Sequence, residues 1–287
     1  MKKYLTDIIW FLIGFAVVNL VFLFAVSRVD WNFKKRLQSL NLDSPEYDYL
    51  ILGNSYALDG IDAELLSSDK NKAYNMAIGG TSVRTNFIQL KEYIRSYDTR
   101  PEKVILALDG FRHDFKSDVV HPIVEFTTDD YQYTFQDLPL IKFRWMFIEM
   151  IKKVISSEHR NAELVQGQLR LAKTISDKTN LPEVPKKLPF KNFKSSPWIQ
   201  KIDSLCVVND IELVLLEMPA VKGKRNDTPV GPHEIRLDNG NLVKLFNFNS
   251  IDFNFGQDPT TDWIGNSHLN ETGARKFTRK IKEVMAL

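Results

Sequence analysis

The first apolar feature of the chain is an unbroken stretch near its start. Residues 8–26 carry no charge, and Asn19 is their only strongly polar side chain. A helix of this length can cross a hydrocarbon core about 30 Å thick. The pattern predicts a single transmembrane helix over 8–26, between a short tail (1–7) and a juxtamembrane linker (27–43). A cleaved signal peptide is the alternative, because Ala-Val-Ser at 25–27 resembles a small-x-small cleavage site.

Beyond the linker, short apolar runs alternate with helix-like segments. The runs predict five strands, at 48–55, 72–80, 102–110, 211–220 and 242–250. Amphipathic segments between and after them predict helices at 82–97, 194–209 and 271–285. This alternation predicts a flavodoxin-like three-layer α/β/α domain over 44–287, with a mostly parallel five-stranded sheet. Ligands of such sheets bind beyond the carboxyl ends of the strands.

One long segment, 111–193, separates the third and fourth predicted strands. An amphipathic stretch at 141–155 and a polar, helix-like stretch at 160–178 predict helices within it. The segment is too long for a plain connection, so we expect a helical insertion in the α/β domain. Insertions over strand ends commonly form lids or partner surfaces. A subdomain that only packs against the sheet is the alternative.

Composition and charge narrow the function classes. The 38 basic and 36 acidic residues are well mixed and give a net charge of +2, so we expect no nucleic-acid partner. The single cysteine, Cys206, excludes an internal disulfide and is expected to be a buried structural thiol. The spacing of the histidines predicts no metal site, and we expect no cofactor.

Candidate chemistry gathers where the predicted strands end. The first strand ends in Gly53-Asn54-Ser55, and His268 stands just before the last helix. A lone serine after a strand is most often a helix N-cap. Here, however, both ends of the chain bring a candidate nucleophile and a candidate base to the same rim of the sheet. Ser55 and His268 could therefore meet there.

Three segments carry a family resemblance. "ILGNSYALDGID" (51–62), "YNMAIGGTS" (74–82) and "SHLNETGARKFTRKI" (267–281) resemble, in order, the blocks of the SGNH or GDSL-type hydrolase superfamily. The set is most similar to membrane-anchored SGNH-like proteins of the bacterial cell envelope. The resemblance implies that Ser55 is the nucleophile and that its own N–H is one oxyanion donor. It also implies that the Gly80 N–H is a second donor and that His268 is the general base.

The chain departs from the family pattern at two positions. The family's orienting acid stands three residues before the histidine, where this chain has Gly265. Asp262 is the nearest upstream carboxylate, and we predict it as the orienting acid. The family's asparagine donor after the third strand falls near Asp109, whose ionised carboxylate can accept but not donate. Asn54, Asp109 and Arg112 lie near the predicted rim, where they are candidates for contact with substrate; for Arg112 a solvated loop is the alternative.

Two functions fit these features. The first is a serine esterase or O-acyltransferase that acts, through a Ser-His acyl-enzyme, on acyl groups of a cell-envelope glycan, acetyl groups being expected. The second is a catalytically inactive SGNH-like module that binds surface polysaccharide or a protein partner. The resemblance implies a single-pass protein of the bacterial cytoplasmic membrane with its domain on the outer side. It also implies a glycan or acylated substrate and a membrane-bound partner in acyl transfer.

Overall fold

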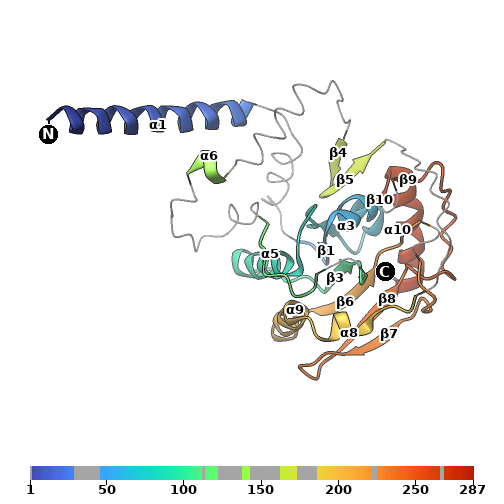
Figure 1. Cartoon of the computed structure of the whole chain (residues 1–287). Coiled ribbons are helices and arrows are strands. Elements are labelled where there is room, and N and C mark those ends of the chain that lie inside the picture. The colour runs from blue at the N-terminus through green and yellow to red at the C-terminus, as the bar shows by residue number, and fades with distance from the viewer. Residues whose placement is uncertain are drawn as a thin grey trace. The chain divides into compact units, whose positions relative to one another are not determined.

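The computed structural model describes residues 2–28, 46–111, 114–121, 138–142, 162–172, 186–221, 225–265 and 268–287 (Figure 1). The chain separates into two compact units. One comprises residues 1–35 and 128–160, and the other comprises residues 36–127 and 161–287. The second unit contains the central sheet and the residues that carry the candidate chemistry.

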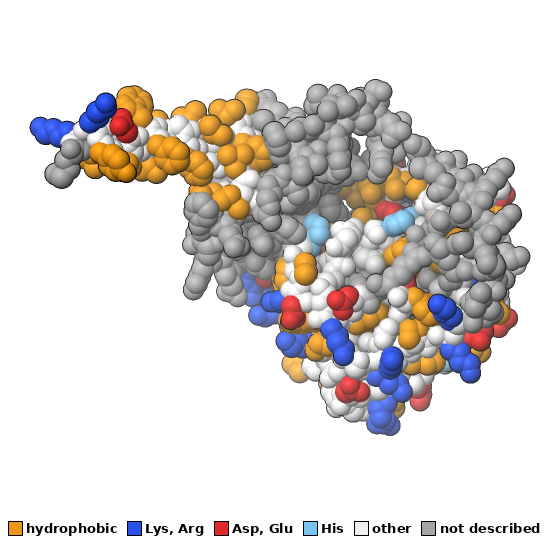
Figure 2. Space-filling view, viewed as in Figure 1, with side chains coloured by type: hydrophobic (Ala, Val, Ile, Leu, Met, Phe, Trp, Pro, Cys, Tyr) orange, Lys and Arg blue, Asp and Glu red, His pale blue; other side chains and the backbone are white. Residues whose placement is uncertain are grey.

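The first unit contains the long N-terminal helix α1 (Lys2–Arg28) and the short helix α6 (Pro139–Lys142). The stretch Lys2–Phe24 has a mean hydropathy of 2.3 and is long and apolar enough to cross a membrane, properties that signal sequences share. Apolar side chains are exposed along this helix (Figure 2). Asn19 is bonded within this unit: its Nδ2 donates to Phe15 O at 2.9 Å on the same helix, and its Oδ1 accepts from Leu140 N of α6 at 3.1 Å.

The second unit is built on a six-stranded sheet in the order β2-β1-β3-β6-β8-β7. The strands are β1 (Tyr49–Gly53), β2 (Ala73–Asn75), β3 (Lys103–Leu108), β6 (Glu212–Glu217), β7 (His233–Arg236) and β8 (Leu242–Asn247). The first five in the order run parallel, and only β7 is antiparallel, to β8. The mostly parallel α/β fold is therefore confirmed, with β7 as a sixth strand that the sequence pattern did not indicate.

Helices cover both faces of this sheet, as the alternating pattern predicts (Figure 1). The predicted helices correspond to α5 (Val83–Ser96), α9 (Pro197–Val208) and α10 (Glu271–Met285). Leu50 and Leu52 point into the core beneath α5 and α9, whereas Tyr49 and Ile51 point into the core beneath α10. This alternation gives a parallel strand its continuous apolar sequence, because both faces are buried. Shorter elements are α3 (Ser55–Gly60), α4 (Ala63–Leu66), α8 (Phe190–Lys194), β9 (Trp263–Ile264) and β10 (His268–Leu269).

Cys206 lies in the core on α9, as predicted. Its side chain is buried, and this burial, with the nearby charge of Asp203, raises the pKa of the thiol to about 12. The thiol therefore remains protonated at neutral pH, which suits a packing role and not a nucleophile.

Part of the predicted helical insertion is wrong. Residues 162–171, expected to be helical, form an antiparallel hairpin of β4 (Ala162–Val165) and β5 (Gln168–Leu171). Its turn is Gln166-Gly167, with φ of 43° and 80°. Positive φ at both central residues is the signature of a tight hairpin turn, a signal that the helical interpretation overlooked. Most of the helix expected at 141–155 lies outside the described residues.

Candidate active site

Strand β1 passes directly into helix α3, and Ser55 is the first residue of that helix. The site therefore lies at the carboxyl end of β1, which stands between β2 and β3. Because the chain runs from β1 to one side and then returns to the other, this strand end is the switch point where flavodoxin-like sheets bind ligands. N–H groups in the first turn of a helix lack intrahelical partners, so the N–H of Ser55 is available to an anion.

The abrupt end of β1 at Gly53 has a steric cause. Gly53 has a φ of +152°, and a Cβ there would lie 2.6 Å from Ala107 O and 2.8 Å from Ala57 Cβ. Any other side chain would push β3 or α3 away. Asn54 then caps the helix, with its Oδ1 accepting from Tyr56 N at 3.0 Å. The glycine and the cap together bring the chain sharply from the strand into the helix.

The loop after β2 runs beside Ser55. A Cβ on Gly79 would lie 3.7 Å from Ser55 Cβ, so these two backbones are neighbours. Gly80, the next residue, has a φ of +72°, and a Cβ built on it would meet nothing within 4 Å. Its requirement for glycine is therefore conformational, and the space in front of it is open.

His268 is held in a specific orientation by two residues of α3. Its Nδ1 lies 2.9 Å from Asp59 Oδ2, and its ring stacks on Tyr56 with a centroid distance of 4.8 Å and an interplanar angle of 14°. The Asp59 side chain is 8% exposed and that of His268 is 30% exposed. The pair thus joins a buried carboxylate to an imidazole that substrate can reach. The neighbouring Leu269 is buried, which fixes the short strand β10.

The carboxylate that contacts His268 is therefore Asp59, and not Asp262, for which the sequence predicted this place. Asp262 is fully buried, and its Oδ2 accepts from Lys276 Nζ at 2.8 Å and from Asp258 N at 2.7 Å. It ties the loop before β9 to helix α10 and does not contact His268. Asp59 escaped sequence reasoning because it lies 209 residues from His268, whereas the family places the acid just upstream of the histidine. A usable signal was its spacing of four residues from Ser55 on one helix face.

The other predicted contacts have mixed outcomes. Asp109 closes a turn after β3, with its Oδ1 accepting from Phe111 N at 3.1 Å. Asn54 acts as the helix cap described above, and Arg112 lies outside the described residues. A further histidine, His121, lies beside α5, where its backbone N–H donates to Thr85 Oγ1 at 3.0 Å. Burial lowers the pKa of its imidazole.

Ser55 and Asp59 lie on α3, and His268 lies on β10, which packs against that helix. Of the expected contacts between the three side chains, only that between Asp59 and His268 is formed. Among the described residues, no hydrogen bond joins Ser55 Oγ to His268. Catalytic hydrogen bonds of this kind are often long in ligand-free enzymes and tighten when substrate binds.

Comparisons with known proteins leave the family open. No family model matches the chain, and no curated protein matches it. Among solved structures, a similar chain is one from Streptococcus pneumonia that is provisionally assigned as a platelet activating factor. It is 13% identical, with a TM-score of 0.39, over 88% of this chain and 90% of that one.

Proposed function

We propose that this protein is a membrane-anchored serine esterase or O-acyltransferase of the SGNH type, with Ser55 as nucleophile, His268 as base and Asp59 as orienting acid. The observation that carries the proposal is the 2.9 Å contact between His268 Nδ1 and Asp59 Oδ2. A carboxylate at Nδ1 fixes the tautomer that leaves Nε2 free to accept a proton. The sequence resemblance alone left the histidine without this partner.

The spacing within α3 supports the same assignment. Ser55 and Asp59 are four residues apart, so they share a face of the helix. The imidazole of His268 is bonded to Asp59 through Nδ1 and stacks on Tyr56, the residue that follows Ser55.

The proposed reaction has two steps, acylation of Ser55 and transfer of the acyl group to water or a sugar hydroxyl. Ser55 Oγ attacks the acyl carbonyl while its proton passes to His268 Nε2, and the N–H groups of Ser55 and Gly80 donate to the resulting oxyanion. The C–O bond to the leaving alcohol breaks as His268 returns the proton to it, which leaves an acyl-serine. Water or a sugar hydroxyl then loses a proton to His268 and attacks the acyl-serine. Collapse of the second intermediate returns that proton to Ser55.

The substrate class follows from the anchor and the resemblance. Helix α1 is long enough to hold the domain at a membrane, where an acylated glycan of the cell envelope would be within reach. We therefore propose a domain on the outer side of a bacterial cytoplasmic membrane and an acylated, most simply acetylated, sugar as substrate. A membrane-bound partner could supply or receive the acyl group.

A fluorophosphonate probe on the detergent-solubilised full-length protein tests the nucleophile. We expect the wild type and Ser204→Ala to be labelled and Ser55→Ala to lose labelling completely. Ser204 is a suitable control because it is exposed on α9, where its Oγ donates to Gln200 O at 2.8 Å. If the folded wild type is not labelled, the enzyme proposal fails and the alternative, a binding or assembly module, takes its place.

A further inference from the structure

The helix that carries Ser55 and Asp59 is too short to hold itself in place. Helix α3 has six residues. Ala57 O accepts from the N–H of Ile61 at 3.1 Å, but the carbonyl groups that follow it at the end of so short a helix lack intrahelical partners. Buried carbonyls need hydrogen bonds from elsewhere, since a buried acceptor without a donor carries the full cost of its lost hydration. The position of α3, and with it the site, therefore depends on which groups donate to these carbonyls.

Two fully buried side-chain amides donate to carbonyl groups in and just after this last turn. Asn75, at the end of β2, donates through Nδ2 to Ala57 O at 2.8 Å and to Ile61 O at 3.0 Å. Gln168, at the start of β5, donates through Nε2 to Asp59 O at 3.1 Å. Both side chains have zero exposure. Asn75 belongs to the sheet, whereas Gln168 belongs to the hairpin of the insertion and reaches the backbone of the residue that orients His268.

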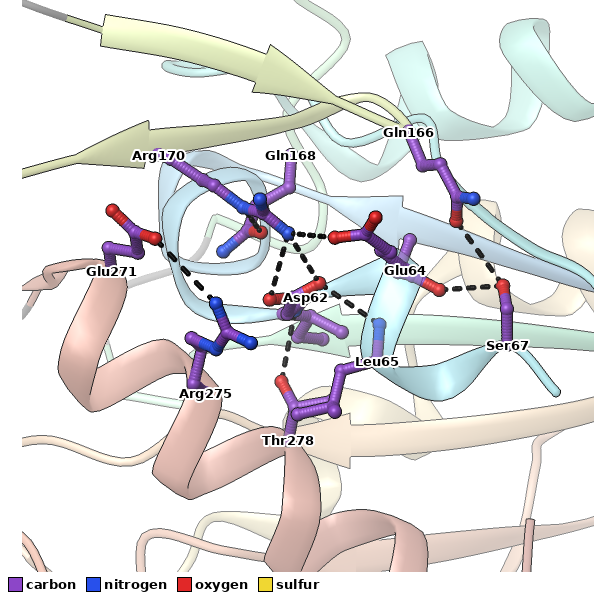
Figure 3. A network of polar contacts seen from close by, with 12 residues as sticks. Asp62, Glu64, Leu65, Ser67, Gln166, Gln168, Arg170, Glu271, Arg275 and Thr278 are labelled. Carbon is purple, nitrogen blue, oxygen red and sulfur yellow. Dashed lines mark hydrogen bonds and ion pairs between the residues drawn. The ribbon is translucent and has the colours of Figure 1, made fainter.

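Arg170 fixes the direction of the Gln168 amide. Its Nε donates to Gln168 Oε1 at 3.3 Å, which turns the Nε2 of Gln168 towards Asp59 O. The same guanidinium contacts Asp62 at 3.2 Å and Glu64 at 2.6 Å (Figure 3). Burial alone would lower the pKa of Arg170, but the contacts with Glu64 and Asp62 raise it, so the guanidinium stays charged.

The turn of the hairpin is docked equally closely. Asn75 N donates to Gln166 O at 3.0 Å, and a Cβ on Gly167 would lie 2.0 Å from Asn75 O, so only glycine fits there. The hairpin thus covers the outer edge of β2 with its turn and contacts α3 through Gln168. Its contacts with the domain are specific and largely buried, unlike those of a loosely packed insertion.

We infer that the hairpin β4–β5 is a working part of the active site and that Gln168 is a positioning residue, which holds Asp59 where it can orient His268. This inference rests on the proposed function, since Gln168 would maintain the arrangement of Ser55, His268 and Asp59 on which that function depends. The insertion then does more than pack against the domain or cover the site. Its hairpin helps to hold in place the helix that carries Ser55 and Asp59.

The test compares two glutamines of the same hairpin that receive the same substitution. Gln168→Met keeps the length of the side chain and removes its donor to Asp59 O. Gln166→Met is the matched control, because the exposed Gln166 side chain accepts from Ser67 Oγ at 3.2 Å and touches no part of α3 among the described contacts. Rates of fluorophosphonate labelling are measured on the full chain, with thermal unfolding to verify folding. The downfield proton resonance of His268 Nδ1–H, assigned by its loss in His268→Gln, reports the Asp59 contact without any reaction.

We expect Gln168→Met to be labelled about 10- to 100-fold more slowly than the wild type, because small misplacements of a catalytic group cost this much. Its Nδ1–H resonance should shift or broaden, while Gln166→Met matches the wild type in both readouts. A second variant, Gln168→Glu, keeps the contact with Arg170 and loses the donor, so it covers the case in which Gln168→Met does not fold.

The inference is overturned if the folded Gln168 variants keep the wild-type labelling rate and resonance, or if Gln166→Met shows the same losses. If the wild type itself is not labelled, the proposed function fails. The resonance comparison between Gln168→Met and Gln166→Met then still decides the positioning role.

Discussion

Two polar clusters lie at the carboxyl ends of the strands and differ in their exposure and in their chemistry. The α3 cluster comprises Ser55, Asp59, Gln168 and His268. The amide cluster comprises Asn226, Thr228, Asn247 and Asn249, beyond β6 and β8. In the amide cluster, Asn247 and Asn226 exchange two hydrogen bonds, of 2.7 and 3.1 Å. Thr228 Oγ1 and Asn249 Oδ1 accept from the backbone N–H groups of Leu188 and Ala220.

The difference distinguishes a cluster that supports the fold from one that can take part in chemistry. The amide cluster consists of neutral groups with at most 8% exposure that bond to one another and to backbone, so it fixes the loops at that end of the sheet. The α3 cluster instead pairs a buried carboxylate with an imidazole whose side chain is 30% exposed. Only the second arrangement offers a proton acceptor to a molecule from outside. Position at the rim of the sheet is therefore not sufficient to identify a site.

Substitution within the α3 cluster should have the largest effect. Asp59→Asn keeps the size of the side chain but removes the carboxylate that orients His268 Nδ1–H. We expect fluorophosphonate labelling of Ser55 to fall by up to about 10⁴-fold, the loss seen when the orienting acid of a serine triad is replaced in this way. Asp262→Asn is the matched control, since its carboxylate bonds Lys276 and not the histidine. Equal losses in both variants would contradict the assignment of Asp59.

Substitution in the amide cluster should affect stability alone. Asn247→Ala leaves the buried amide of Asn226 and the carbonyl of Thr228 without their bonds to Asn247. We expect the free energy of unfolding to fall by about 1–3 kcal/mol, and the melting temperature by about 2–4 °C for each kcal/mol. The labelling rate of Ser55 in the folded variant should stay at the wild-type value. A labelling loss without a stability loss would make the amide cluster part of the site.

An ion pair at the opposite end of the strands, where β6 begins, should matter least. Glu212 starts β6 and contacts Lys244 at 3.0 Å and Lys103 at 3.4 Å. Burial opposes the shift, but these two lysines lower the pKa of Glu212, so its ion pairs stabilise the fold above about pH 4.3 and are lost as the pH falls through the lowered pKa. Because the side chain is 43% exposed, Glu212→Gln should cost less than about 1 kcal/mol at pH 7. The cost should shrink in unfolding measurements as the pH is lowered through the pKa of Glu212, and labelling should be unchanged at pH 7.

The pattern of apolar and polar residues along the chain was enough to predict the parallel strands of the sheet. Each of the five parallel strands is an apolar run closed by polar or small residues, and the helices between them show one apolar face. These are local properties with a fixed period, so they can be read without knowing what packs against them. The hairpin at 162–171 was missed because its short strands resemble one polar helix and only the Gln166-Gly167 turn distinguishes them.

The sequence by itself determined the apolar N-terminal helix, the parallel sheet, and the placement of Ser55 after the first strand. Only the tertiary structure decided which carboxylate contacts His268, because the contact with Asp59 depends on how β10 packs against α3. It also decided that Gln168 reaches Asp59, across a separation of 109 residues. Periodic burial is a local property of the chain, whereas a hydrogen bond between distant residues exists only once the layers are assembled.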